Sequence, residues 1–313
     1  MSTHGNGTGP STPTDPSARR WGPVLKRTIK EFRQDNLTDW AAALTCYGVL
    51  ALFPALVFLV SILGLVGPSA TQPLIQNLTA LAPSQAKDIV NSALTNIQHA
   101  RGAAGVAFVI GLVLALWSAS GYIGAFIRAS NAIYEVPEGR PFWKLRPLQL
   151  VVTFLMVMLL VVSALAVVIS GPITKSIGRL VGIGNTGQTI FSIAKWPILA
   201  LVVSLMFSLL YWAAPNVKQR GFRWITPGGV LAVIVLVLAS ALFALYTTHF
   251  PNNKTYGAFG GVIFFLTWLW IANIAVLLGQ ELNAEVERSR ELAAGLPAEK
   301  ELQLPPRAAP KEG

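Results

Sequence analysis

The sequence predicts an all-α membrane protein, a polytopic bundle of six transmembrane helices. Of its 313 residues, 53% are hydrophobic and only 12% are charged, whereas soluble domains average about 25% charged residues. The apolar residues form six long runs instead of short amphipathic stretches. The segments that connect these runs alternate between many and few basic residues, which is the pattern of a chain that crosses a membrane repeatedly.

The chain before the first run divides into a tail and a helix. Residues 1–20 are rich in Ser, Thr, Pro and Gly, and this composition predicts a disordered tail. In residues 21–36 two sets of residues recur at helical spacing on different faces: apolar Trp21, Leu25, Ile29 and Phe32, and basic Lys26, Arg27, Lys30 and Arg33. A basic amphipathic helix with a tryptophan suits the membrane surface. The same pattern also suits a helix that packs on the cytoplasmic end of the bundle.

Each of the six runs is long enough for one crossing, which needs about 20 apolar residues. The runs are 41–66, 103–127, 148–170, 190–212, 226–250 and 257–279. None of them contains Asp or Glu, and the single Lys or Arg within them is Lys195. Because Lys195 is expected near the outer end of the fourth run, its ammonium can reach the membrane interface along its aliphatic stem.

The distribution of basic residues predicts the orientation of the chain. In the tails and connecting segments, eighteen Lys and Arg lie on the side of the two termini and five on the other side. Basic loops stay in the cytoplasm, so the sequence predicts a multi-pass protein of the plasma (inner) membrane with both termini cytoplasmic. We expect a membrane domain over residues 21–292 and a disordered C-terminal tail over 293–313. Apolar periodicity in the outer segment 67–102 predicts one or two short helices across the outer face.

The sequence predicts neither an enzyme nor a cofactor or metal site. The three histidines, His4, His99 and His249, fall in the tail, the outer loop and the outer end of the fifth run. They therefore cannot converge on a cytoplasmic site. The single cysteine, Cys46, excludes a disulfide within one chain and a cysteine-based metal site. The net charge of +10 lies beside the apolar runs, so the expected partners are the lipid bilayer and anionic head groups on the cytoplasmic side, and not nucleic acid. The oligomeric state is left open.

Polar residues inside the spans are the first set of candidate functional residues. They are Tyr47 in the first span, Ser118 and Tyr122 in the second, and Asn273 in the sixth. Asn273 is the costliest of them because its amide lies well inside an apolar run. Two interpretations remain open at this point: these residues line a polar path for a substrate, or they form hydrogen bonds that pack one helix on another.

A second candidate set lies where the second and sixth spans reach the cytoplasm. Arg128, Asn131 and Glu135 stand three or four residues apart on one helical face. The segment that follows the sixth span adds Glu281, Asn283 and Glu285. We expect a cytoplasmic rim in which the first group pairs either with the Glu281–Glu285 face or with lipid head groups.

Several segments together carry a resemblance to a known family. They are residues 41–54 (AAALTCYGVLALFP), 117–128 (WSASGYIGAFIR), 214–218 (APNVK) followed by Trp224 and Pro227, 255–257 (TYG), and 278–285 (LGQELNAE). In order and spacing they resemble the YihY/BrkB family of bacterial inner-membrane proteins over roughly residues 23–290. The resemblance implies six transmembrane helices. The family was formerly labelled ribonuclease BN and has been linked to virulence, serum resistance and envelope lipid traffic.

These observations support three functional hypotheses. The first is a membrane protein that transports or scrambles a lipid or another envelope amphiphile, because a polytopic bundle without enzyme motifs has a basic cytoplasmic rim and polar residues in three spans. The second is a membrane scaffold for envelope assembly. The third is a membrane-tethered ribonuclease, which requires clustered acids at one mouth of the bundle.

Overall fold

A computed structural model of the chain describes residues 21–66, 104–168, 185–219, 221–249 and 257–309. Within these ranges the regular structure is helical, apart from one isolated β-bridge between Val217 and Pro306. The helices are α1 (Trp21–Gln34), α2 (Leu37–Val66), α5 (Ala104–Ile133), α6 (Phe142–Val168), α8 (Asn185–Ala213), α9 (Pro227–His249) and α10 (Gly257–Ala293). The expected N-terminal tail and the short helices of the first outer loop lie outside the described residues.

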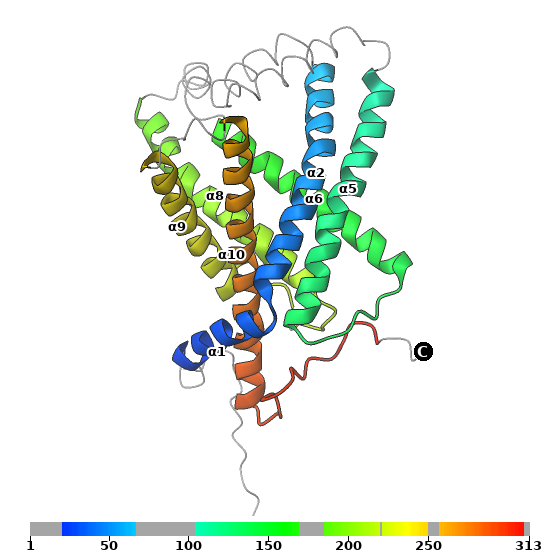
Figure 1. Cartoon of the computed structure of the whole chain (residues 1–313), viewed down its shortest axis with the longest axis vertical. Coiled ribbons are helices and arrows are strands. Elements are labelled where there is room, and N and C mark those ends of the chain that lie inside the picture. The colour runs from blue at the N-terminus through cyan, green and yellow to red at the C-terminus, as the bar shows by residue number, and fades with distance from the viewer. Residues whose placement is uncertain (1–20, 67–103, 169–184, 220, 250–256, 310–313) are drawn as a thin grey trace, which may run out of the picture.

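The six long helices pack in a closed order. Each of α2, α5, α6, α8 and α9 contacts the next long helix along the chain, and α10 returns to contact α2. Figure 1 shows two of these neighbouring pairs, α2 beside α5 and α9 beside α10. Helix α1 lies across the lower part of α10, where Val24 packs against Leu282 and Val286.

Four of the described helices are long and apolar enough to cross a membrane by length and composition. The crossing segments are Phe142–Leu160 in α6, Trp196–Ala213 in α8, Pro227–Tyr246 in α9 and Gly260–Ala293 in α10. Helices α2 and α5 have 30 residues each. All six long helices overlap the predicted apolar runs. The clearest difference is at α10, which continues beyond Gly279 as far as Ala293, because its last turns are held by contacts with α1 and the C-terminal segment.

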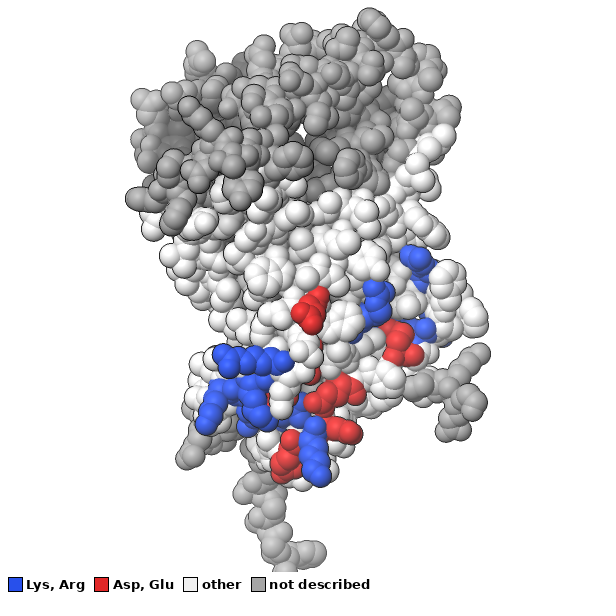
Figure 2. All heavy atoms as spheres, viewed as in Figure 1, with Lys and Arg blue, Asp and Glu red and all other residues white. Residues whose placement is uncertain are grey.

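The described charged side chains gather toward one end of the molecule. In Figure 2 the Lys, Arg, Asp and Glu side chains on the visible face lie at the end formed by α1, the last turns of α10 and the nearby loops. We call this the charged end. Away from it, large apolar side chains such as Leu50, Val113, Val237 and Val262 are more than half exposed. A helical surface of this kind suits lipid and not water.

The tightly packed core lies toward the charged end. Its fully buried side chains include Leu44 of α2, Phe126 of α5, Tyr211 of α8 and Leu277 of α10. The Tyr211 ring stacks on Phe126 at 6.3 Å between centroids, and the Tyr211 hydroxyl donates a hydrogen bond to the carbonyl oxygen of Val276 at 2.7 Å. Two candidate residues, Tyr47 and Tyr122, pack against this core.

The C-terminal segment differs from the expected disordered tail. Residues 294–309 run along the charged end to the last turn of α8 (Figure 1). Arg307 donates to the carbonyl oxygens of Trp212 at 2.6 Å and Val217 at 2.8 Å, and the Ala308 amide donates to Asn216 at 3.1 Å. The polar composition of this segment concealed its order, because the contacts that fix it come from residues far away in the sequence.

Candidate functional site

Three helices meet at a buried hydrogen-bonded seam around Asn273. Asn273 of α10 is 2% exposed. Its Oδ1 accepts a hydrogen bond from the hydroxyl of Tyr122 in α5 at 2.8 Å, and its Nδ2 donates to Oγ1 of Thr45 in α2 at 3.1 Å. We call Thr45, Tyr122 and Asn273 the seam. Both polar atoms of the Asn273 amide have protein partners, so the contacts of this residue are those of helix packing.

The other two residues from the same set also lie between α2 and α5. The Ser118 hydroxyl donates to the carbonyl oxygen of Leu50 at 3.1 Å. The Tyr47 hydroxyl accepts from Arg128 at 3.4 Å, and the Arg128 guanidinium lies 5.6 Å from the centre of the Tyr47 ring. The structure therefore joins Tyr47, a candidate for a polar path or for helix packing, to Arg128, which was expected in the rim.

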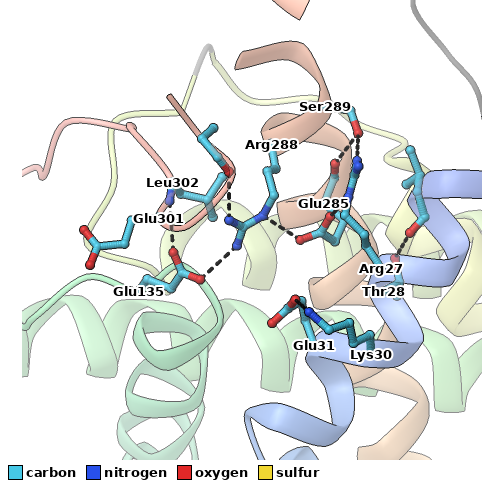
Figure 3. A network of polar contacts seen from close by, with 12 residues as sticks. Arg27, Thr28, Lys30, Glu31, Glu135, Glu285, Arg288, Ser289, Glu301 and Leu302 are labelled. Atoms are coloured by element: carbon cyan, nitrogen blue, oxygen red, sulfur yellow. Dashed lines mark hydrogen bonds and ion pairs between the residues drawn. The ribbon is translucent and has the colours of Figure 1, made fainter. Parts of the chain in front are cut away.

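An ion-pair network at the charged end joins α1, α5 and α10 (Figure 3). The Glu285 side chain is 0% exposed and pairs with Arg27 of α1 at 2.7 Å and with Arg288 at 2.7 Å. Arg288 also pairs with Glu135 at the end of α5 at 2.9 Å and donates to the carbonyl oxygen of Ala298. We call Arg27, Glu135, Glu285 and Arg288 the Arg288 network. Because its central carboxylate is buried and doubly paired, the network locks the last turns of α10 against its neighbours.

Glu135 has an unusual backbone conformation. Its φ is 53°, a left-handed value that helix ends usually assign to Gly or Asn. The amide of Val136 donates to the carbonyl of Asn131 and that of Glu135 to Ala132, so the residue closes α5 in a Schellman arrangement. The Glu135 carboxylate then accepts from Arg288 at 2.9 Å and from the Leu302 amide at 2.9 Å. These bonds offset the strain of the left-handed backbone.

Arg128, Asn131 and Glu135 of the expected rim line one open hollow at the end of α5, but Asn131 makes its hydrogen bonds to a different group. Its side chain donates to Glu138 at 2.9 Å and accepts from the amide of Asn216 at 2.8 Å. Arg140 pairs with the same Glu138 at 2.7 Å. Burial raises the pKa of Glu138, but the hydrogen bonds from Arg140 and Asn131 outweigh it and hold that pKa below its ordinary value. This group ties the α5–α6 loop to the end of α8.

Asn283 lies on another face of α10 from Glu285 and holds α9. Its Oδ1 accepts from the Gly228 amide at 2.9 Å, and its Nδ2 donates to Oγ1 of Thr226 at 3.3 Å. Gly228 and Gly279 touch here, and a Cβ on either would overlap the carbonyl oxygen of the other. The close approach of α9 and α10 therefore requires both glycines.

A small cavity opens beside Asn283, between α8, α9 and α10. Its volume is about 80 Å³, and its lining includes Tyr134, Ser208, Arg223, Thr226, Asn283 and Glu287. The Ser208 side chain is 1% exposed, and its hydroxyl has no hydrogen-bond partner among the described residues. We call this cavity the α8–α10 pocket. Apart from Asn283, sequence reasoning missed its residues, and the only available signal was a pair of serines, Ser204 and Ser208, one helical turn apart in an apolar run.

Gln280 is the second unsatisfied polar residue of interest. It is 0% exposed, and neither its amide oxygen nor its amide nitrogen has a hydrogen-bond partner in the described part of the chain. Asn273, Gln280 and Glu287 are spaced seven residues apart along α10, so they lie close to one line on the helix surface. This polar stripe leads from the α8–α10 pocket at Glu287 to the seam at Asn273.

Two acids on the network side also lack full compensation. Glu281 is buried, and one of its carboxylate oxygens has no partner among the described residues. Asp35 lies in the turn between α1 and α2, where partial burial, followed by the negative charge of Glu31, raises its pKa to about 6. Within the described residues no group of three or more His, Cys, Asp or Glu is placed to hold a metal ion.

Comparison with known proteins places the chain in a family. A family model described as virulence factor BrkB matches residues 28–303. The chain belongs to this family. The match covers the resembling segments found in the sequence. No solved structure matches the chain significantly.

Relatives of this BrkB-family chain carry two kinds of name. The ribonuclease-like protein YfkH of Bacillus subtilis (strain 168) is 31% identical over 269 residues, which cover 86% of this chain and 96% of the relative. A UPF0761 membrane protein of Chromohalobacter salexigens is 31% identical over 290 residues, covering 85% of this chain and 64% of the relative. A UPF0761 membrane protein of Idiomarina loihiensis is 26% identical over 274 residues. The chain thus spans less than two thirds of the Chromohalobacter protein. The two UPF0761 names state a membrane location, and the long apolar helices of this chain agree with it.

Proposed function

We propose that this BrkB-family protein crosses the plasma (inner) membrane six times, with α2, α5, α6, α8, α9 and α10 as the spans. The charged end then faces the cytoplasm, as the excess of basic residues there supports. In this placement α1 lies at the membrane surface, because Trp21, Leu25 and Ile29 are exposed while Val24 packs on α10. The two interpretations of the N-terminal helix are therefore compatible, since one side meets the bundle and another meets lipid.

For a protein placed in the membrane in this way, the proposed function is transport or scrambling of a lipid or another envelope amphiphile. The observation that carries it is Gln280, a fully buried amide with no partner among the described residues. Leaving a buried polar group unpaired costs about 1–3 kcal/mol, so packing alone gives no reason for an amide here. Polar residues in membrane helices commonly mark the path of a substrate. The stripe from Glu287 through Gln280 toward Asn273 gives such a path a direction.

In the closed state, the hydrogen bonds of the seam block this path. A polar head group that follows α10 from the charged end meets the hydrogen bonds among Thr45, Tyr122 and Asn273. Passage requires α2 and α5 to separate from α10, which exchanges these bonds for bonds to the head group. Asn273 acts in this proposal as part of a gate and not as an open binding group.

The test is lipid translocation by the purified protein in sealed liposomes that carry head-group-labelled anionic and neutral lipids. We expect exchange well above that of empty liposomes. The Gln280→Leu variant should fold normally and lose most of the activity, because the change removes only an unpaired amide. The matched control is Gln149→Leu on α6, where the buried amide has a partner in Arg146 and lies away from the stripe; it should keep the activity.

Two other outcomes decide between the remaining functions. If no exchange occurs with or without an ion gradient, transport is rejected, and a membrane scaffold for envelope assembly becomes the better proposal. If purified protein cleaves RNA and keeps this activity through stringent purification, the function indicated by the name of the Bacillus relative applies. Cleavage lost on further purification would count against a ribonuclease.

A further inference from the structure

We infer that the α8–α10 pocket binds the phosphate-bearing head group of an anionic amphiphile whose acyl chains stay in the adjoining leaflet. The inference rests on the proposed function for one point only, that the ligand is a membrane component. Three features of the pocket support it: the positive charge of the lining, an unpaired buried hydroxyl and the apolar surface around the mouth.

The electrostatic field of the pocket favours an anion. The pocket lies at the first turn of α9, a helix of 23 residues that begins at Pro227. The N-terminus of a helix carries a partial positive charge, and Arg223 adds a full positive charge to the same lining. Thr226 precedes the helix and accepts from the Gly229 amide at 3.0 Å, which fixes the orientation of this turn.

The Ser208 hydroxyl is evidence for a ligand that does not depend on the charge of the pocket. Ser208 comes from α8, is 1% exposed and lines the pocket, and its hydroxyl has no partner among the described residues. A phosphate oxygen can accept the hydroxyl proton in a charge-assisted hydrogen bond. The pocket therefore contains a donor that the fold itself does not use, placed near a cation and a helix N-terminus.

The one acid in the lining does not cancel this field. Glu287 pairs with Arg290 at 2.6 Å, so its negative charge is met by a cation of its own. Asn283 is also engaged, since its amide bonds to the Gly228 amide and to Thr226. Arg223 and Ser208 are consequently the groups that we expect a ligand to contact.

The surroundings of the pocket indicate an amphiphile instead of a soluble anion. Next to Arg223, the side chains of Trp224 and Ile225 are 69% and 58% exposed, and Phe222 packs edge-on against Trp212 and Trp224. Tryptophan beside basic residues is typical of the membrane interface. About 10–15 Å³ of such cavity volume admits one water molecule, so a cavity of about 80 Å³ has room for a small polar group.

The experiment measures binding to the purified full-length protein in nanodiscs of neutral lipid. The probes are short-chain phosphatidic acid, short-chain phosphatidylcholine and inorganic phosphate. We expect phosphatidic acid to bind more tightly than both others. Arg223→Gln should weaken its binding by about tenfold or more, as loss of a hydrogen bond to a charged group predicts, and Ser208→Ala should weaken it by a smaller factor. The matched control is Lys218→Gln, an exposed cation of the same loop that does not line the pocket.

Each outcome bears on the inference. Equal losses from Lys218→Gln and Arg223→Gln would mean general surface attraction and would overturn it, as would absence of phosphatidic acid binding. Inorganic phosphate binding as tightly as phosphatidic acid would identify a site for a soluble anion and overturn the amphiphile. Selective binding lost in Arg223→Gln supports the site even if the liposome assay shows no translocation, so the two proposals can fail separately.

Discussion

At the charged end, two faces of α10 carry buried polar residues that differ in whether they have hydrogen-bond or ion-pair partners. On one face Glu285 and Arg288 bind each other and reach Arg27 and Glu135. On the other face Gln280 has no partner among the described residues, and the nearby α8–α10 pocket contains the unpaired hydroxyl of Ser208. The Glu285, Gln280 and Ser208 side chains are all 1% exposed or less, so burial does not separate them. What separates them is whether the protein supplies the partner of each polar atom.

This difference distinguishes a structural role from a ligand-binding one. A paired buried group is already satisfied and can change partners only if helices move. An unpaired buried group has a free-energy cost that a ligand can remove. The seam around Asn273 belongs with the Arg288 network in this respect, whereas the sequence alone left Asn273 open to either a polar path or helix packing.

The largest effect is expected from Arg288→Met. Arg288 is buried and supplies one of two cations to the fully buried Glu285. Removing one partner of a buried ion pair costs about 3–5 kcal/mol, and we expect the lower end because Arg27 stays. Urea unfolding in mild detergent measures this loss. In the control Lys30→Met, the lost partner is Glu31 in an exposed pair, and the cost should be less than about 1 kcal/mol. Similar losses in both variants would mean that the network does not lock α10.

A middle-sized effect should separate Asn273→Leu from Gln280→Leu. The first change leaves the Tyr122 hydroxyl without its acceptor, and a buried unpaired donor costs about 1–3 kcal/mol. The second removes an amide that has no partner among the described residues and should leave stability unchanged or raise it. The same unfolding measurement compares them. If Gln280→Leu destabilises as much as Asn273→Leu, then Gln280 is satisfied after all, and the proposed path loses its support.

Much of the fold could be predicted because one strong signal controls it. An apolar run of about 20 residues needs a helix to cross a membrane, and all six long helices overlap their predicted runs. The C-terminal segment gave no such signal. Its order comes from single long-range contacts, such as that of Arg307 with the carbonyl of Val217, and these depend on where α8 ends in space.

The candidate site was less predictable for the same reason. The helical spacing of Arg128, Asn131 and Glu135 gave a shared face, but α5 ends at Ile133 and Glu135 turns in a left-handed conformation. Glu135 therefore meets α10, while Asn131 meets the end of α8. Similarly, Ser208 and Gln280 are ordinary polar residues in the sequence. Their lack of partners is a property of the packed bundle.

The smallest effect concerns Asp35, an acid on the network side whose charge is not fully compensated. Partial burial and Glu31 raise its pKa from 3.8 to about 6, so the folded protein holds this proton more tightly than the unfolded chain does. The contribution of Asp35 to stability is therefore full at a pH below about 4, falls as the pH rises to about 6, and stays reduced above that range.

Asp35→Asn should remove this slope and be more stable than the native protein at pH 7, whereas Asp39→Asn, which changes an exposed acid in the first turn of α2, should keep the slope. Unfolding of the three proteins at several values from pH 4 to pH 8 gives the comparison. A stability difference between the native protein and Asp35→Asn that does not change with pH would contradict the raised pKa. It would show that the Asp35 charge is compensated like the charges of the Arg288 network.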